Sequence, residues 1–171
     1  GARVIALARR PPGEETGRFL ASEAERIVWV QGDVRDRAGL IALARQHKVD
    51  KVVHGAAMTP SATVERDQTA AIVDINLMGT LNALEAAREV GVRRFVFISS
   101  TGLYGAPANP QRLLTEDEPL STTNLYTLCK FASEQLCRRY NELHGFSTIV
   151  GRLGSAYGPM ERASQSRENM S

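Results

Sequence analysis

The fold of this chain is decided by one stretch near its middle, RFVFISSTGLYG, which runs from Arg94 to Gly105. After Arg94, four residues in succession are aromatic or β-branched, which is typical of a strand buried on both faces. Hydroxyl residues and glycine follow at once, so we expect a strand over 94–98 that places Ser99 and Ser100 at its carboxyl end. Such strands form parallel sheets covered by helices, and these sheets bind ligands beyond the carboxyl ends of their strands.

Similar short apolar runs recur on both sides of this stretch. The predicted strands cover residues 3–8, 26–31, 51–54, 94–98 and 148–150. Helical patterns separate them, and this alternation predicts a doubly wound α/β domain with a parallel, Rossmann-type sheet. Residues 1–159 are expected to form one domain, and residues 160–171 an irregular tail or the start of a further unit.

Three helices are predicted from apolar residues at helical spacing. Asp36 is a typical N-cap for the first, which runs to about His47, and the second passes through Leu77, Leu81 and Leu84 to a C′ residue at Gly91. The third runs from about Asn124 to His144. The residues expected to face the core are Leu40, Ile41, Leu43 and Ala44 on the first helix and Leu125, Leu128, Ala132 and Leu136 on the third.

The composition limits the function classes. The net charge is +2 in 171 residues and the basic residues are scattered, which does not favour a nucleic-acid partner. No apolar run approaches the roughly 20 residues that span a membrane, and no signal peptide is visible. Cys129 and Cys137 would lie about 12 Å apart along a helix, too far for a disulfide, and no metal-ligand spacing is present. We therefore predict a cytoplasmic protein with two buried thiols, no metal site and no membrane contact.

Tyr126 and Lys130 are the first candidates for chemistry. At positions i and i+4 they share one helix face, so the ammonium can lie close to the phenol. A nearby cation lowers the pKa of a phenol, because it favours the phenolate. Such a tyrosine can pass a proton to or from a substrate hydroxyl while hydride moves to a cofactor. Ser100 adds a hydroxyl at the carboxyl end of the preceding strand.

Six motifs in a fixed order give the chain a resemblance to a known family. They are GDVRD at 32–36, HGAA at 54–57, DINLMGT at 74–80, SSTGLYG at 99–105, YTLCK at 126–130, and Arg152 with YGP at 157–159. In this order they resemble the extended short-chain dehydrogenase/reductases, the nucleotide-sugar epimerase and dehydratase group. The resemblance covers residues 3–159.

The resemblance implies a role for each matching residue. Tyr126 would be the acid/base, Lys130 would hold the nicotinamide ribose and lower the pKa of the tyrosine, and Ser100 would hydrogen-bond the reacting oxygen. The further cofactor-binding residues that it implies are Asp33 and Val34 at the adenine, Ala56 and Ala57 along the dinucleotide, Asn76 as support for the strand or a proton relay, Ser99 next to Ser100, and Arg152, Gly154 and Ser155 beside the nicotinamide.

Several of these residues also have a purely structural interpretation. Asp33 can cap a turn, and His54 fits a packing residue at a strand end better than a catalyst. Ser99 can be a structural neighbour of Ser100, and Tyr104 can be a packing aromatic.

The end of the strand at residues 3–8 bears on the choice of cofactor. In the family this strand usually ends in an acid that binds the ribose 2′-hydroxyl of NAD, whereas here Ala8 is followed by Arg9 and Arg10. An arginine can pair bidentately with a 2′-phosphate that an acid would repel, so we predict NADP as the preferred cofactor and NAD as the alternative. The structural alternative is a pair of surface arginines before a turn.

The Gly-rich loop with which the family binds pyrophosphate is not found in the sequence. The sequence starts at Gly1, directly before the strand that follows this loop in the family, and most of the family's substrate lobe would lie after Pro159. The strand before the loop is central in the usual 3-2-1-4-5-6 order, so we expect the other strands to flank an open place in the sheet. The chain is interpreted as a segment of a longer protein, or as a domain whose first unit is not represented.

The resemblance implies an NAD(P)-dependent epimerase or oxidoreductase that acts on a hydroxyl or ketone of a nucleotide sugar or a similar polyol. The family's 4,6-dehydratases carry Asp-Glu after the Ser or Thr, and Thr101-Gly102 stands there instead, which disfavours dehydration. A non-catalytic dinucleotide-sensing protein of the same fold is the alternative, although such relatives commonly lose the Tyr or Lys that this chain keeps. Family members often dimerise through the Tyr/Lys helix, so a homodimer is also expected.

Overall fold

The computed structural model describes residues 1–106 and 113–154 and contains all five predicted strands. They are β1 Val4–Ala8, β2 Ile27–Gln31, β3 Lys51–His54, β4 Arg94–Ser100 and β5 Thr148–Leu153. The last two extend further than predicted, because β4 and β5 stay paired to their carboxyl ends, where Ser99 is opposite Arg152 and Ser100 is opposite Leu153.

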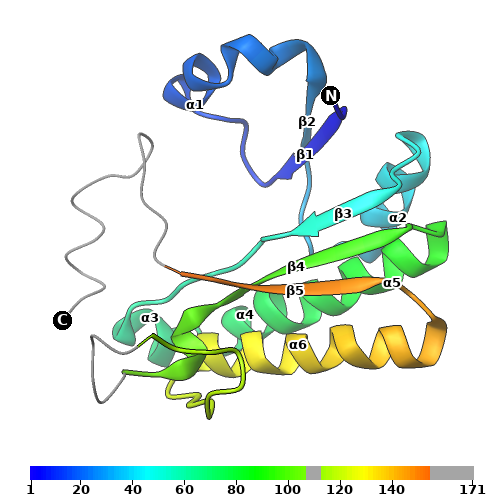
Figure 1. Ribbon diagram of the computed structural model, residues 1–171. Helices are drawn as coiled ribbons and strands as arrows, with labels where there is room; N and C mark the ends of the chain where they lie inside the picture. Colours follow the sequence, from blue (N-terminus) through cyan, green and yellow to red (C-terminus); the bar gives the residue numbers. More distant parts are fainter. Residues whose placement is uncertain (107–112, 155–171) are drawn as a thin grey trace.

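The strands form two parallel ladders, which confirms the expected sheet type. β1 pairs with β2, and β4 lies between β3 and β5. Within the described residues no ladder joins β1 to β3, and Figure 1 shows the two groups of strands set apart. In the 3-2-1-4-5-6 order of doubly wound sheets, the break falls at the central strand, so the predicted open place in the sheet is confirmed.

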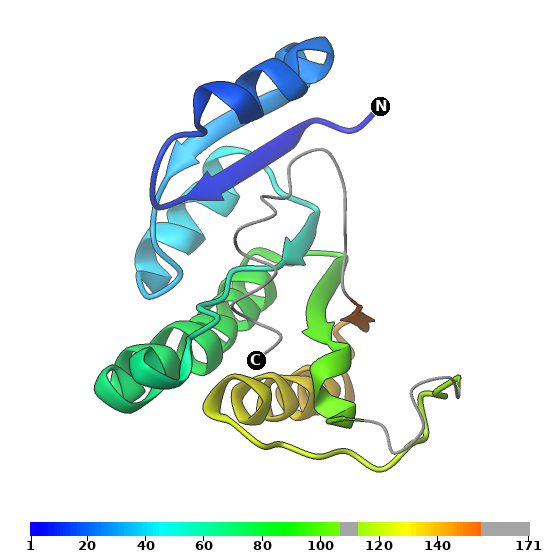
Figure 2. The same cartoon turned by 90° about the vertical axis from the view of Figure 1, so that its left-hand side faces the viewer.

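Helices cover the strands, and the three long predicted ones are present. In chain order the helical segments are α1 Glu14–Phe19, the 3₁₀ turn η1 Ala21–Arg26, α2 Arg37–Gln46, α3 Ala62–Asp67, α4 Thr69–Val73, the π-helical segment η2 Asp74–Met78, α5 Gly79–Val90, the 3₁₀ turn η3 Thr101–Tyr104 and α6 Leu125–His144. Figure 2 shows α1 and α2 on opposite sides of β1 and β2, with α5 and α6 on one side of β4. The short segments α1, α3 and the 3₁₀ turns were not predicted, because they are too short and polar for a helical period.

The ends of the helices follow from local chemistry, and the predicted caps at Asp36 and Gly91 are confirmed. The Asp36 side chain accepts a hydrogen bond from the backbone N–H of Gly39 at 2.9 Å and begins α2. Asn124 and Thr127 form a capping box that begins α6. Gly91 ends α5 with φ +74°, a left-handed conformation that glycine adopts without strain.

The main core lies where α5 and α6 pack on β4. Its fully buried members include Phe95 and Phe97 from the strand, Leu84 from α5 and Cys137 from α6. Burying side chains of this size stabilises the fold by roughly 1.5–3 kcal/mol each. Cys129 and Cys137 are both buried and unpaired, as the sequence predicted.

The predicted buried stripe of α6 is wrong. Leu128 is 49% exposed, and Leu125, Ala132 and Leu136 are only partly buried. The buried face of the helix instead consists of Thr127, Cys129, Lys130, Ser133, Glu134 and Cys137. Periodicity counts apolar residues, whereas this face buries polar groups. Thr127 bonds the N-cap Asn124, and the other polar side chains find partners in the strands and in η2.

None of the helices in the described ranges has the length and apolar character needed to cross a membrane.

Candidate functional site

Lys130 and Tyr126 meet the carboxyl end of β4, where the sequence predicted the chemistry. The ammonium of Lys130 donates a hydrogen bond to the carbonyl of Ile98 at 2.6 Å and lies 4.8 Å from the centroid of the Phe97 ring. It is also 5.6 Å from the centroid of the Tyr126 ring. The i, i+4 spacing therefore does what was predicted: it brings the cation next to the phenol.

Burial sets the charge behaviour of Lys130. The residue is 3% exposed, and this burial lowers the pKa of its ammonium from 10.5 to about 8. At neutral pH the ammonium still carries most of its charge.

Ser100 lies on the turn that packs against the start of α6. Its hydroxyl oxygen accepts a hydrogen bond from the backbone N–H of Gly102 at 3.1 Å and so begins η3. A Cβ at Gly102 would lie 3.6 Å from Thr127 Cγ2, which places this turn on the first turn of the helix, next to Tyr126. The turn that Ser100 begins thus packs on the first turn of α6, the helical turn to which Tyr126 belongs.

Asn76 supports the segment that follows β3. Its side-chain amide donates to the carbonyl of Met58 at 2.9 Å and accepts from the N–H of Met58 at 2.7 Å. Its own carbonyl accepts from the hydroxyls of Thr80 at 2.7 Å and Ser133 at 3.3 Å. The exposed residues Ala56 and Ala57 belong to the segment that is held in this way. Asn76 therefore supports this part of the predicted dinucleotide path.

His54 is a packing residue at the end of β3. It is buried, its ring stacks on Phe97 at a centroid distance of 6.1 Å, and its Nε2 lies 3.1 Å from the Thr80 hydroxyl oxygen. The Thr80 hydroxyl donates its single proton to Asn76, so Nε2 of His54 is the donor in the other bond. Burial and, to a smaller extent, the charge of Lys130 lower the pKa of His54 to about 4, so the ring is neutral.

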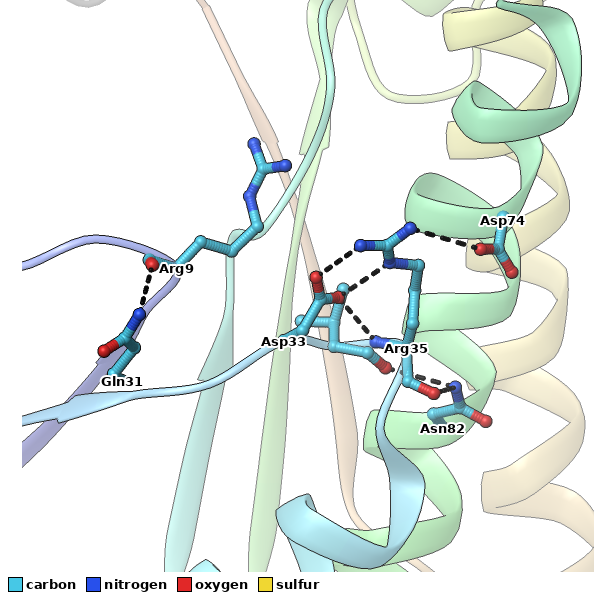
Figure 3. Close-up of polar contacts among 7 residues, drawn as sticks. Arg9, Gln31, Asp33, Arg35, Asp74 and Asn82 are labelled. Atoms are coloured by element: carbon cyan, nitrogen blue, oxygen red, sulfur yellow. Dashed lines mark hydrogen bonds and ion pairs between the residues drawn. The ribbon is translucent and has the colours of Figure 1, made fainter.

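Asp33 lies at the carboxyl end of β2 in an ion-pair cluster (Figure 3). Its carboxylate accepts from Nε and Nη2 of Arg35 at 3.0 and 2.7 Å and from the backbone N–H of Arg35 at 2.9 Å. Hydrogen bonds from Arg35 lower the pKa of Asp33 to about 2, so the carboxylate stays ionised and able to accept. The same guanidinium approaches Asp74 to 3.9 Å, which connects the loop to the π-helical segment η2.

A second set of contacts fixes this loop on α5. The side-chain amide of Asn82 donates to the carbonyls of Val34 at 3.1 Å and Arg35 at 3.3 Å. Gly79 lets the loop come close, because a Cβ there would lie 2.6 Å from Val34 Cγ2. Asp33 and Val34 are thus held in place by a helix that belongs to the other group of strands.

Arg9 and Arg10 are exposed at the carboxyl end of β1. The carbonyl of Arg9 accepts from the side-chain amide of Gln31 at 3.2 Å, and its charge contributes to the lowered pKa of Asp33 (Figure 3). The two arginines and Asp33 therefore lie on the same edge of the ladder formed by β1 and β2, as parallel pairing requires.

Arg152 and Ser99 belong to a network that the sequence did not reveal. Arg152 forms a bidentate pair with the buried Glu134, with Nε–Oε1 and Nη2–Oε2 distances of 3.0 and 2.8 Å. This pairing raises the pKa of Arg152 above its usual value. The Ser99 hydroxyl donates to Glu134 Oε1 at 2.5 Å. Gly154 directly follows β5 and is the last residue that the structure describes, so Ser155 lies outside the described residues.

Glu134 and Arg35 are the residues that sequence reasoning missed. A signal for Glu134 was present, since Tyr126, Lys130 and Glu134 follow one another at i, i+4 and i+8 on one helix face. Arg35 lies two residues after its main partner Asp33, but no sequence pattern indicated its second contact, with the distant Asp74.

The comparisons with known proteins agree with this geometry. The profile of the NAD dependent epimerase/dehydratase family matches residues 1–171. The chain belongs to this family. Among curated relatives it is 31% identical to dTDP-4-dehydro-6-deoxy-D-allose reductase of Streptomyces bikiniensis over 98% of the chain and 52% of that protein. It is 33% identical to UDP-glucose 4-epimerase of Rhizobium meliloti over 75% of the chain and 38% of that protein.

A solved structure extends the comparison to three dimensions. A double mutant of dTDP-glucose 4,6-dehydratase from Streptomyces venezuelae, solved with NAD bound, superposes with a TM-score of 0.81 at 27% identity. The match covers 95% of this chain and 49% of that one. The chain thus spans about half the length of the relatives it matches, and its parallel strands and helices have the family's Rossmann-type arrangement.

The buried, neutral His54 predicts an acid-sensitive fold. The pKa of His54 is about 4 in the folded state, whereas the ordinary value, expected in the unfolded state, is 6.5. Between pH 4 and 6.5 the unfolded state therefore binds a proton that the folded state does not. Stability is then complete above pH 6.5 and falls by about 3 kcal/mol as the pH drops to 4. Urea unfolding of the whole protein between pH 7 and 4.5 should show this loss in the wild type. His54→Gln should lack it, and the exposed-site control His144→Gln should retain it. An identical pH slope in His54→Gln would contradict the assignment.

Proposed function

We propose that the protein is an NAD(P)-dependent epimerase or oxidoreductase that acts on a hydroxyl or ketone of a nucleotide sugar or similar polyol through Ser100, Tyr126 and Lys130. The observation that carries the proposal is the buried ammonium of Lys130, held on the Ile98 carbonyl and 5.6 Å from the Tyr126 ring centroid. Relatives that are named as a reductase and an epimerase of sugar nucleotides support this substrate class.

The residues at the carboxyl ends of the strands fit a dinucleotide. Asp33 offers an ionised acceptor for an amino group, and the small exposed residues Ala56 and Ala57 leave room for a flat or extended ligand. Lys130 has two N–H donors beyond the one used by Ile98, which suits the hydroxyls of a ribose. When bound, a nicotinamide would accept or supply the hydride.

The chain's own residues would handle the proton. Ser100 would donate a hydrogen bond to the substrate oxygen and hold it near the Tyr126 hydroxyl. Tyr126 would take the proton of a substrate hydroxyl or return it to a ketone, with the buried ammonium of Lys130 beside its ring. The ring of Phe97, 4.8 Å from the ammonium, and the neutral ring of His54 that stacks on it give Lys130 apolar surroundings.

Epimerisation and simple oxidoreduction are favoured over dehydration. Elimination of water calls for an acid and a base next to Ser100, and Thr101 and Gly102 occupy these places. The Thr101 hydroxyl instead donates to the carbonyl of Leu153 at 3.3 Å, and Gly102 lies against Thr127. We therefore place the protein with the epimerases and reductases of the family, and in the cytoplasm.

Tyr126→Phe tests the proposed chemistry. Removal of the phenol hydroxyl should lower turnover of UDP-glucose or a dTDP-sugar by about 10²–10⁴-fold, since general acid–base catalysis contributes that much. Cofactor affinity should stay nearly unchanged, and Tyr140→Phe is the matched control on the same helix, where the hydroxyl bonds Glu85. Unchanged turnover in Tyr126→Phe would refute the mechanism. Binding of cofactor by a wild type that turns over no sugar nucleotide would favour a sensing protein.

NADP is proposed as the preferred cofactor because Arg9 and Arg10 are exposed where a 2′-phosphate would lie. Calorimetric titration of the whole protein with NADPH and NADH should give tighter binding of NADPH. Loss of an arginine–phosphate pair costs about 1.5–3 kcal/mol, so Arg9→Gln or Arg10→Gln should weaken NADPH at least about tenfold and leave NADH unchanged. Arg18→Gln, on the exposed face of α1, is the control. Preference of the wild type for NADH would overturn this choice.

A homodimer is proposed through the outer face of α6. Leu128 is 49% exposed, and Leu125 and Ala132 continue its stripe along the helix, so these residues are available to a partner helix. Leu136, further along, packs against the core instead. Sedimentation of the whole protein should show a dimer that Leu128→Glu dissociates, whereas Leu113→Glu, at a 91% exposed position outside the helix, should not. A wild type that sediments as a monomer would exclude this assembly.

A further inference from the structure

We propose that Glu134 and Arg152 form a positioning pair that fixes the carboxyl ends of β4 and β5, and the segment 113–121, against the helix that carries Tyr126 and Lys130. This inference rests on the proposed function and adds two residues to its machinery. Neither touches the reacting atoms in the proposal. Both act through Ser99, Tyr104 and the backbone.

Glu134 follows Lys130 by one helical turn on the same face of α6. Its side chain is 8% exposed, so its carboxylate is removed from water and depends on protein partners. Those partners come from two strands: Ser99 of β4 donates at 2.5 Å, and Arg152 of β5 donates twice, at 3.0 and 2.8 Å. A bidentate guanidinium–carboxylate pair fixes both distance and orientation, so the helix cannot slide along the strands without breaking it.

Arg152 carries the connection onward to the turn after Ser100. Its Nη1 donates to the Tyr104 hydroxyl oxygen at 2.8 Å, and its guanidinium carbon lies 5.0 Å from the centroid of the Tyr104 ring. Tyr104 ends η3, the same turn that the Ser100 hydroxyl begins. The turn that carries Ser100 is therefore held on both sides. Before it, Ser99 is hydrogen-bonded to Glu134, and at its end Tyr104 is hydrogen-bonded to Arg152. Together these bonds set the direction of the Ser100 hydroxyl.

The same nitrogen also holds the segment that leads toward α6. Nη1 donates to the carbonyl of Glu116 at 3.1 Å, and further along the N–H of Ser121 donates to the carbonyl of Leu103 at 2.7 Å. The segment 113–121 is thus attached to Arg152 through Glu116 and to η3 through Ser121, shortly before the helix begins at Leu125.

The number of donors in use argues for positioning and not for ligand binding. Arg152 makes four hydrogen bonds to Glu134, Tyr104 and Glu116, out of the five N–H donors that a guanidinium has. The pair is also mostly buried, with 20% of the Arg152 side chain and 8% of the Glu134 side chain exposed. A guanidinium whose donors are occupied by protein groups in this way fixes the positions of those groups.

Glu134→Gln tests the pair in the whole protein. The amide keeps the shape of the side chain and removes the charge that holds Arg152. Misplacement of a catalytic constellation by about 1 Å costs on the order of a hundredfold, so kcat for UDP-glucose or a dTDP-sugar should fall by about that factor. Affinity for NADPH should be unchanged, and amide hydrogen exchange should accelerate in residues 113–121 but not in β1 and β2, which report on folding.

Two further variants sharpen the test. Arg152→Lys keeps the charge but cannot form the bidentate pair, so it should reproduce the effect of Glu134→Gln. The double variant should be no worse than either single one, because both remove the same interaction. Glu142→Gln is the matched control, since its carboxylate pairs with Arg139 on the exposed side of the same helix.

Each outcome decides the matter. Wild-type kcat and wild-type exchange in Glu134→Gln would overturn the positioning role. Loss of NADPH affinity with kcat preserved at saturation would overturn it too, and would make Arg152 a cofactor-binding residue. If the wild type turns over no sugar nucleotide, the proposed function fails, yet the exchange in residues 113–121 still decides whether the pair holds this segment.

Discussion

Lys130 places a positive charge in the interior of the protein with a backbone carbonyl as its acceptor. Burial of an ammonium is unfavourable unless its surroundings compensate, and here the Ile98 carbonyl and the faces of two aromatic rings do so. The carbonyl belongs to the last part of β4, so the bond sets how far along the strand α6 can lie. Tyr126, four residues earlier, is then fixed beside the turn that carries Ser100. The geometry of the candidate site thus follows from how one buried cation is accommodated.

Two further polar groups on the buried face of α6 help to fix the position of this helix relative to the strands. Ser133 donates to the carbonyl of Asn76, and Glu134 holds Ser99 and Arg152. Each of these partners belongs to a different element: the π-helical segment η2, strand β4 and strand β5. A helix attached at so many polar points has one position that satisfies them all. Hydrophobic contact alone, which has no direction, would allow several.

A second consequence concerns the two ladders, which share no strand pairing in the described residues. Their connection is made by helices and loops: α2 packs on α5, and the loop after β2 is held by Asn82, by Asp74 through Arg35, and by the close approach of Val34 to Gly79. Asp33 therefore reaches the same side of the molecule as the Ser/Tyr/Lys group without a continuous sheet between them.

The sequence by itself determined the five strands, the parallel class of the sheet, the long helices with the caps at Asp36 and Gly91, and the pairing of Tyr126 with Lys130. All of these depend on local propensity or on spacing within one element, which is readable from neighbouring letters. The tertiary structure decided which face of α6 is buried, because Lys130, Ser133 and Glu134 could enter the interior only with partners from β4, β5 and η2. It also decided the approach of Arg35 to Asp74 and the partners of Arg152, which lie on other elements far along the chain. Hydrogen bonds and ion pairs between distant segments have no period in the sequence, so only the folded chain could show them.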